Sequence, residues 1–326
     1  MRRRALLGAF AGIALARPIL PRSQPAARRV TYLSMLTPDD AAPGHKLLID
    51  ALLARGWTQG RNLMLEWHYA ESDSKSLSQL AARIVRAAPD VIVANGPAPA
   101  LELKKAGTKR PVVFVVVFDP VKLGLAESLA RPGGSFTGLS TAVPEGFFGK
   151  QLTLLREAVP KLSRLAMLSN PRNPIHTMTR DRRLESARTL GFEPIELQAA
   201  TLEEIEPAFR EAARRAADAM YVGGDPLTMS HRPLVAELAL RGRLPTFFLF
   251  REHVEAGGLM SYGADRSDLV RRGAEYVDRI LRGALPRDLP IEQPTKFDLV
   301  INLKTARALG LALPQSLLLQ ATEVIE

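Results

Sequence analysis

The chain has 326 residues, of which 46% are hydrophobic and 24% charged, a balance typical of a globular protein long enough for two domains. It contains no cysteine, which excludes disulfides, thiolate catalysis and cysteine metal sites. Much of the formal net charge of +10 comes from residues 1–29, which hold seven arginines and no acidic residue. The rest is nearly balanced and shows no basic stripe with interleaved aromatics, so we expect no nucleic-acid partner.

The N-terminus has the pattern of an export signal. A basic start is followed by an apolar stretch at 5–16 and by the small-x-small cleavage pattern Ala14-Leu15-Ala16. The apolar stretch is too short to span a bilayer of about 30 Å. We therefore expect residues 1–29 to be an export signal with a short N-terminal segment, and the mature protein to be periplasmic. Residues 3–7 loosely match a twin-arginine signal, so the Sec and the twin-arginine routes both stay open.

From residue 30 the pattern alternates between strand and helix, in two runs. In the first run, strands are expected at 30–35, 63–67, 90–94 and 111–118, with helices at 43–55, 76–88 and 98–106. A turn-rich stretch at 131–140 ends this run. In the second run, helices are expected at 145–158, 175–190, 202–216, 230–241, 265–282 and 304–309, and strands at 165–168, 192–198, 219–222, 245–250 and 297–303. Two such runs predict two doubly wound parallel sheets with helices on both faces.

In doubly wound sheets, ligands bind beyond the carboxyl ends of the strands, so the loops after strands supply the candidate site residues. Asn95 could donate to a ligand carboxylate together with N–H groups at the next helix start, and Asp225 could pair with a ligand ammonium group. Each has a structural alternative as a helix N-cap or turn residue. The candidate loop residues are Thr37, Asn95, Gly96, Asp119, Asn170 and Asp225.

The heptapeptide at 257–263, Gly-Gly-Leu-Met-Ser-Tyr-Gly, adds a further candidate. Glycines at both ends are unusual inside a strand and suit a segment where the chain changes direction. Tyr262 is therefore expected at the floor of a cleft, with a packed core aromatic as the alternative. Trp57 and Trp67 fall before the ligand-facing ends and are interpreted as packing residues.

No catalytic or metal-binding motif is found. The sequence lacks the dinucleotide, P-loop, zinc-protease, nucleophile-elbow and EF-hand patterns, and its five histidines are never at metal-ligand spacing. The arginine pairs Arg182-Arg183 and Arg271-Arg272 lie on expected helices and are interpreted as solvated faces. We expect no metal, no cofactor and no enzymatic activity.

Three blocks of sequence carry a resemblance to a known family. They are Asp119-Pro120-Val121 with 128–134 and 137–139, the segment 255–263, and the long segment 289–306 running on to 308–311 and 323–326. Together they resemble the substrate-binding proteins of ABC transporters, the tryptophan/tyrosine type in particular, over about residues 30–326.

The resemblance implies a type I periplasmic-binding-protein fold, in which two α/β lobes are joined by three hinge crossings. Hinges absorb backbone rotations when the lobes close. Lobe 1 is expected at 30–139 plus 262–291, and lobe 2 at 143–258 plus 297–326. The expected hinges lie near 138–144, 257–263 and 293–299.

The function implied is capture of a small, amino-acid-like molecule, with an aromatic amino acid as one option, between the lobes of a monomer. The closed protein would deliver its ligand to an ABC permease in the inner membrane. A ligand-binding protein that serves a sensor, and a secreted α/β enzyme, stay open as alternatives. A ligand-responsive transcription regulator is disfavoured, because an export signal stands where its DNA-binding helices would be.

Overall fold

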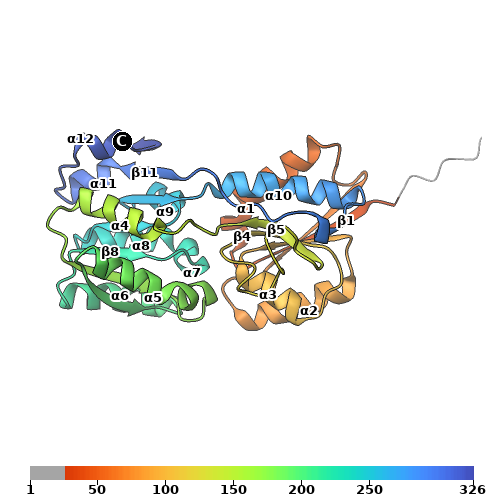
Figure 1. Cartoon of the computed structure of the whole chain (residues 1–326), viewed down its shortest axis with the longest axis horizontal. Helices are drawn as coiled ribbons and strands as arrows, with labels where there is room; N and C mark the ends of the chain where they lie inside the picture. The colour runs from red at the N-terminus through yellow and green to blue at the C-terminus, as the bar shows by residue number, and fades with distance from the viewer. Residues whose placement is uncertain (1–25) are drawn as a thin grey trace, which may run out of the picture.

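The computed structural model describes residues 26–326, and the protein consists of two lobes side by side (Figure 1). Each lobe has a central, mostly parallel sheet with helices on both faces. This confirms the predicted two-lobed, doubly wound α/β fold. The first 25 residues of the predicted export signal lie outside the described part of the chain.

Lobe 1 contains a five-stranded parallel sheet in the order β2-β1-β3-β4-β5. Helices α1 and α10 cover one face and α2 and α3 the other, with a separate apolar core under each pair. Strand β3 is buried at every position, which explains its continuous apolar sequence. The elements are β1 (Arg28–Ser34), α1 (Pro38–Leu53), β2 (Leu63–Tyr69), α2 (Ser74–Ala87), β3 (Val91–Asn95), α3 (Pro97–Lys105), β4 (Val112–Val117), β5 (Phe136–Ser140), α10 (Arg266–Leu281) and the 3-10 turn η1 (Pro286–Asp288).

Lobe 2 contains a seven-stranded sheet in the order β12-β11-β10-β9-β8-β6-β7. Its pairs are parallel except β10 with β11, which is antiparallel. The first half comprises α4 (Phe147–Ala158), β6 (Arg164–Ser169), α5 (Pro174–Thr189), β7 (Glu193–Gln198), α6 (Leu202–Arg214), β8 (Ala219–Val222) and α7 (Pro226–Ser230). The second half comprises α8 (Arg232–Arg241), β9 (Thr246–Phe248), α9 (Arg251–Glu255), β10 (Met260–Gly263), β11 (Asp298–Asn302), α11 (Leu303–Ala308), α12 (Gln315–Leu318) and β12 (Glu323–Ile325).

Two elements of lobe 1 differ from the sequence prediction. Helix α1 begins at Pro38 rather than at residue 43, because the Thr37 side chain caps it and proline suits a first helical position. Residues 136–140, expected within a turn-rich stretch, form the edge strand β5. Gly138 in this strand has φ +143°, and a Cβ there would clash with the backbone of Phe114 on β4. The glycine thus serves close strand pairing, not a turn.

The prediction that lobe 1 resumes at residue 262 is wrong, because residues 260–263 are a strand of the other sheet. Met260 and Ser261 pair with β9, and all four residues pair with β11. Gly263 is needed at the end of this strand, since a Cβ there would collide with the carbonyl oxygen of Leu249. The chain therefore leaves lobe 2 only after Gly263 and enters α10 at Arg266.

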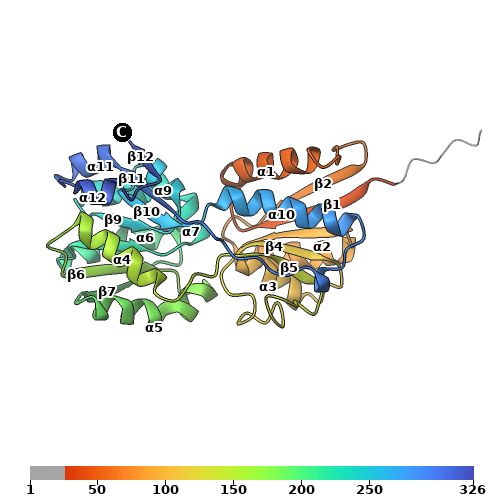
Figure 2. The same cartoon turned by 45° about the horizontal axis from the view of Figure 1, so that its top comes forward.

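The chain passes between the two sheets three times: after β5, between β10 and α10, and before β11. Figure 2 shows these segments running side by side between the lobes. The third is tied to the first, because Ser140 N donates to the carbonyl oxygen of Glu292 at 2.8 Å. Within residues 26–326, no helix is both long and apolar enough to cross a membrane.

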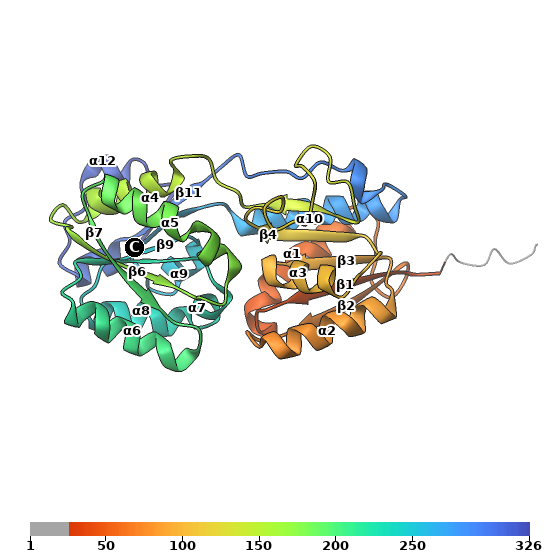
Figure 3. The same cartoon turned by 60° about the horizontal axis from the view of Figure 1, so that its bottom comes forward.

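The lobes also contact each other directly next to the second crossing, where Leu36 and Asp40 of lobe 1 and Arg232 of lobe 2 line one pocket with Asp265 and Arg266. Figure 3 shows the two lobes with the crossing segments along the top of the view. Leu36 and Ala41 of lobe 1 share a small apolar cluster with Met229 and Phe250 of lobe 2. Next to it, Arg232 Nη1 of lobe 2 donates to Asp40 of lobe 1 at 2.5 Å. These noncovalent contacts add to the three chain crossings in holding the two lobes against each other.

Candidate ligand-binding cleft

The strand order places one topological switch point in each lobe. In lobe 1, β2 and β3 pair with opposite edges of β1, so the direction of the chain reverses there. In lobe 2, β7 and β8 pair with opposite edges of β6 in the same way. Ligands of open α/β sheets bind at such points, where loops separate beyond the strand ends. The residues to inspect are therefore those that follow β1, β3, β6 and β8.

The lobe 1 side of the cleft is built by the ends of β1 and β3. Asn95, the last residue of β3, is buried, and its Nδ2 donates to Ser34 Oγ at the end of β1 over 3.3 Å. Gly96 follows with φ +99° and begins α3 without a side-chain cap. Two of the first three residues of α3 are prolines, which have no N–H, so Ala98 N is the one backbone donor that this turn can offer a ligand; the positive end of the helix dipole still favours a negatively charged group.

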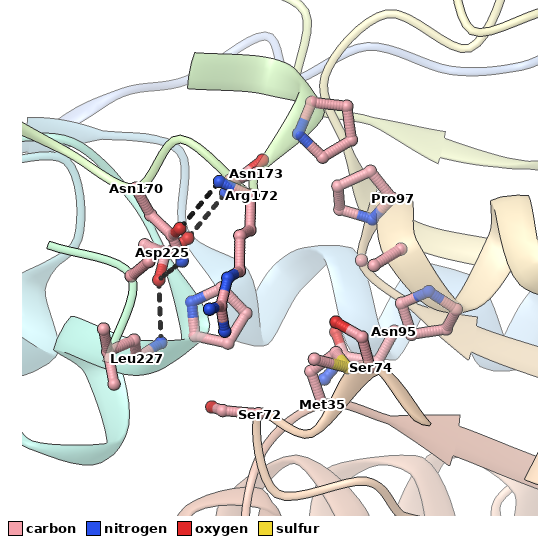
Figure 4. Close-up of a pocket in the computed structure, with 16 residues that line it drawn as sticks. Met35, Ser72, Ser74, Asn95, Pro97, Asn170, Arg172, Asn173, Asp225 and Leu227 are labelled. Carbon is pink, nitrogen blue, oxygen red and sulfur yellow. Dashed lines mark hydrogen bonds between the residues drawn. The ribbon is translucent and has the colours of Figure 1, made fainter. Parts of the chain in front are cut away.

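The lobe 2 side centres on Asp225, which follows β8 and is only 4% exposed. Its carboxylate accepts hydrogen bonds from Asn170 Nδ2 at 3.1 Å, Asn173 Nδ2 at 2.8 Å and Leu227 N at 2.9 Å. Figure 4 shows these donors converging on the carboxylate, with Asn95 and the lobe 1 residues across the gap. Asp225 is thus both the N-cap of α7 and the centre of a buried polar cluster.

Two adjoining pockets lie between these sides, and both take residues from both lobes. The outer pocket, of about 580 Å³ with its open part included, is lined from lobe 1 by Ser72, Ser74 and Asn95 and from lobe 2 by Asn170, Arg172 and Asp225, among others. The central pocket, of about 650 Å³, shares Met35, Asn95, Gly96, Pro97, Asn173, Asp225 and Pro226 with it. Figure 4 shows the Arg172 side chain reaching into the space between the lobes.

A third pocket, the hinge-side pocket, extends the central pocket toward the crossings. It measures about 510 Å³ and reaches the crossing segments at Thr141, Val143 and Ala264. Its other lining residues are mostly aromatic or apolar: Phe118, Phe147, Phe148, Ile175, Tyr221, Leu249 and Phe250, with the polar His176, Thr179 and Arg183 and the glycines 223 and 224. The three pockets form one continuous cleft, polar at its outer end and apolar toward the hinge.

His176 links the polar cluster to the hinge-side pocket. Its Nδ1 accepts from Asn170 N at 2.7 Å, and its Nε2 lies 3.2 Å from the carbonyl oxygen of Gly224. These partners fix a neutral ring that carries its proton on Nε2. Burial lowers the pKa of His176 to about 4, with Asp225 acting against the shift and Arg183 adding to it. At neutral pH the imidazole therefore brings no charge to the cleft.

Four of the seven predicted site residues lie together at the cleft, and three do not. Asn95, Gly96, Asn170 and Asp225 line the outer pocket. Thr37 caps α1 and bonds Asp40, and Asp119 accepts from Lys122 N in a turn after β4; both lie outside the three pockets. Tyr262 also lies outside them: its ring stacks on Phe147 at 5.3 Å between centroids, against the core of lobe 2.

Sequence reasoning missed Asn173 and misjudged Arg183. Asn173 precedes a proline, as Asn170 does, and an Asn-x-x-Asn-Pro spacing after a strand could have marked a second cap. The prediction that Arg183 lies on a solvated face is wrong, because its side chain is 5% exposed and lines the hinge-side pocket. The neighbouring Arg182 is exposed, so the error lay in treating the two as one surface pair.

Comparison with known proteins shows the family. The model of the family described as ABC transporter substrate binding protein matches residues 39–325, and the chain therefore belongs to that family. A tyrosine-binding protein of Clostridioides difficile is 26% identical over 266 residues, which cover 82% of this chain and 76% of the relative.

Solved structures share the fold of the chain. A conserved domain protein from Vibrio cholerae is 27% identical and matches with a TM-score of 0.86 over 91% of this chain and 99% of its own. An ABC domain from Streptococcus pneumoniae in complex with L-Trp is 23% identical and gives a TM-score of 0.85 over 92% and 100%. The fold is that of type I periplasmic binding proteins, as predicted, and the family is one of solute-binding proteins rather than enzymes.

Proposed function

We propose that the chain is an exported solute-binding protein that captures an amino acid between its lobes and delivers it to an ABC permease in the inner membrane. The observation that carries the proposal is the convergence of both switch points on one cleft, with Asn95 from lobe 1 and Asp225 from lobe 2 on opposite sides. The tyrosine-binding relative supports an amino acid as ligand, and the aromatic and apolar lining of the hinge-side pocket suits a large side chain.

The polar groups of the cleft suit the two charges of a free amino acid. Two places in the cleft suit a carboxylate: the outer end, with Ala98 N at the start of α3 and the Arg172 guanidinium, and the hinge-side end, with the Arg183 guanidinium. Asp225 uses three acceptor positions on protein donors, which leaves one lone pair of its carboxylate for an ammonium group. Closure over the ligand would bury both charges, and burial of a charge is favourable only when it is paired.

The test is a thermal-shift screen of the purified protein, unfolded and refolded to remove carried ligand, against the twenty amino acids, nucleosides, sugars and small aromatic acids. A ligand at about 100 times its Kd adds about 2.7 kcal/mol of stability. We expect a shift with one or a few amino acids, those with aromatic side chains first. A shift confined to sugars or nucleosides would contradict the amino acid, and no shift at all would contradict capture.

Two variants then test the site with the same chemical change. Asp225→Asn should weaken binding at least tenfold, because it removes the charge that would face the ammonium group. Asp119→Asn should leave affinity unchanged, since Asp119 lies outside the three pockets. Equal affinities of the two variants, measured by calorimetry, would remove Asp225 from the proposed site.

A further inference from the structure

Arg183 is a buried cation for which the described part of the protein provides no counter-ion. It projects from α5 toward the sheet, is 5% exposed, and lines the hinge-side pocket. Its Nη2 donates to the carbonyl oxygen of His176 at 3.1 Å, while its Nε has no hydrogen-bond partner. Within residues 26–326, no carboxylate lies within 4.0 Å of its guanidinium.

The nearby groups do not neutralise this charge. Glu196, the carboxylate with the strongest influence on Arg183, is already paired with Arg180 at 2.6 and 2.7 Å on the lobe surface. Tyr221 stays protonated, because burial raises its pKa to about 12, and its hydroxyl donates to Gln151 at 3.0 Å. His176 is neutral at pH 7. No Asp or Glu lines the hinge-side pocket, which holds Arg183 as its one charged lining residue.

The fold makes room for the guanidinium beside this pocket. A Cβ at Gly223 would lie 2.7 Å from His176 Nε2 and 3.1 Å from Arg183 Nη1, so a side chain at this position would press on both. The loop of Gly223 and Gly224 thus lies directly over the arginine and also lines the pocket. A buried, unpaired charge is strongly destabilising, and an anionic ligand removes that penalty.

We propose that Arg183 forms a subsite for the carboxylate of the ligand, at the apolar, hinge-side end of the cleft. The guanidinium offers its free N–H groups to the two carboxylate oxygens, a geometry that Arg binds well. The surrounding rings of Phe118, Phe148 and Phe250 receive the apolar body attached to that carboxylate. The proposal deepens the proposed function and rests on it: it makes a carboxylate next to an apolar group the recognised feature.

The test compares matched ligands on matched variants by calorimetry. The ligands are L-tyrosine, tyramine, which lacks the carboxylate, and 3-(4-hydroxyphenyl)propionate, which lacks the ammonium group; L-tryptophan and tryptamine form a second pair. The proteins are the wild type, Arg183→Met, Arg183→Lys and Arg180→Met. Arg180→Met is the control: it is the same substitution on the same helix, but Arg180 is exposed and pairs with Glu196 on the surface.

We expect Arg183→Met to weaken binding of the carboxylate-bearing ligands at least 30-fold, Arg183→Lys to weaken it less, and Arg180→Met to have no effect. Removal of the ligand carboxylate should lower the affinity of the wild type at least tenfold and that of Arg183→Met less than threefold. If Arg183→Met does not fold, Arg183→Lys still tests the bidentate geometry, and the ligand pairs on the wild type test the carboxylate.

The outcomes separate this proposal from the proposed function. If the amino acids bind wild type and Arg183→Met equally well, amino-acid capture stands and the Arg183 subsite is wrong. If only the propionate binds, through Arg183, the subsite stands and the amino acid is wrong. If removal of the ligand carboxylate weakens binding to the wild type and to Arg183→Met by the same factor, the carboxylate lies elsewhere in the cleft and the Arg183 subsite is wrong. If no compound of either series binds the wild type, both proposals fail.

Discussion

Two buried charges of lobe 2 lie on either side of His176 and differ in how the protein treats them. Asp225 receives three hydrogen bonds, two from asparagine side chains and one from the backbone. Arg183 makes one, to a backbone carbonyl. A charge with most of its hydrogen-bonding positions filled by the protein contributes to the fold even when no ligand is present. A charge with few such partners is destabilising in the ligand-free state, and the difference indicates that Arg183 gains more from a ligand than Asp225 does.

The largest effect that follows from this comparison is on stability, at Asp225. Asp225→Ala should lower the free energy of unfolding of the ligand-free protein by about 3 kcal/mol, because it removes a helix cap and leaves two buried amides without an acceptor. Urea unfolding measures this. Asp119→Ala is the control: it removes a partly exposed turn contact and should cost less than about 1 kcal/mol. Equal losses would show that the buried cluster is not structural.

The next largest effect is a pH dependence of the free energy of unfolding, which comes from His176. Its pKa of about 4 lies below the value of about 6.5 in an unfolded chain, so the unfolded state binds more protons between these values. The contribution of neutral His176 is therefore complete above about pH 6.5 and is lost as pH falls toward 4, by up to about 3 kcal/mol.

Histidine-labelled NMR titration measures this pKa directly. Asp225→Asn should lower it further, because Asp225 stabilises the charged ring, and Arg183→Met should raise it, because Arg183 destabilises that ring. Opposite shifts from the two variants would place both charges next to the imidazole. An unshifted pKa near 6.5 in the wild type would contradict a buried, neutral His176.

The sequence predicted the architecture and the outer end of the cleft, and it missed the hinge-side end. Asn95, Asn170 and Asp225 were found because strand ends and Pro-containing loops are visible in the sequence. Arg183 was not found, because a shift of one residue along a helix decides whether an arginine points to water or to the sheet. Its neighbour Arg182 is exposed. Tyr262 was misplaced since a short strand with glycine at its end has the same sequence pattern as a crossing.

A smaller effect is expected for Arg183 in the absence of ligand. Arg183→Met should lower the free energy of unfolding by no more than about 1 kcal/mol, or even raise it. The variant loses one hydrogen bond, but it also removes an unpaired buried charge. This is the reverse of the result at Asp225, and urea unfolding of both variants in one buffer compares them. If Arg183→Met lowers the free energy of unfolding by more than about 2 kcal/mol, Arg183 is a structural residue and does not differ from Asp225 in this respect.

The smallest effect concerns Asp40 and Arg232, one of the two ion pairs that residues 26–326 form between the lobes; the other joins Arg266 of lobe 1 to Glu252 of lobe 2. Burial alone would raise the pKa of Asp40, but hydrogen bonds from Thr37 and Arg232 outweigh it and hold the pKa below its usual value. The stabilisation from this pair is therefore complete above about pH 4 and is lost as pH falls through the lowered pKa. At neutral pH the pair contributes under about 1 kcal/mol, since Arg232 is about a third exposed.

Because Asp40 and Arg232 belong to different lobes, that energy favours the lobe arrangement described here and not either lobe alone. Arg232→Met should leave the unfolding of each lobe unchanged but weaken ligand binding about threefold at pH 7, since the ligand contacts both lobes and gains from the arrangement that brings them together. Lys46→Met, which breaks the exposed pair with Asp50 inside α1, should change neither. If Arg232→Met binds ligand as tightly as the wild type, the other contacts between the lobes, among them the Arg266–Glu252 pair and the apolar contact of Leu36 and Met229, are sufficient without it.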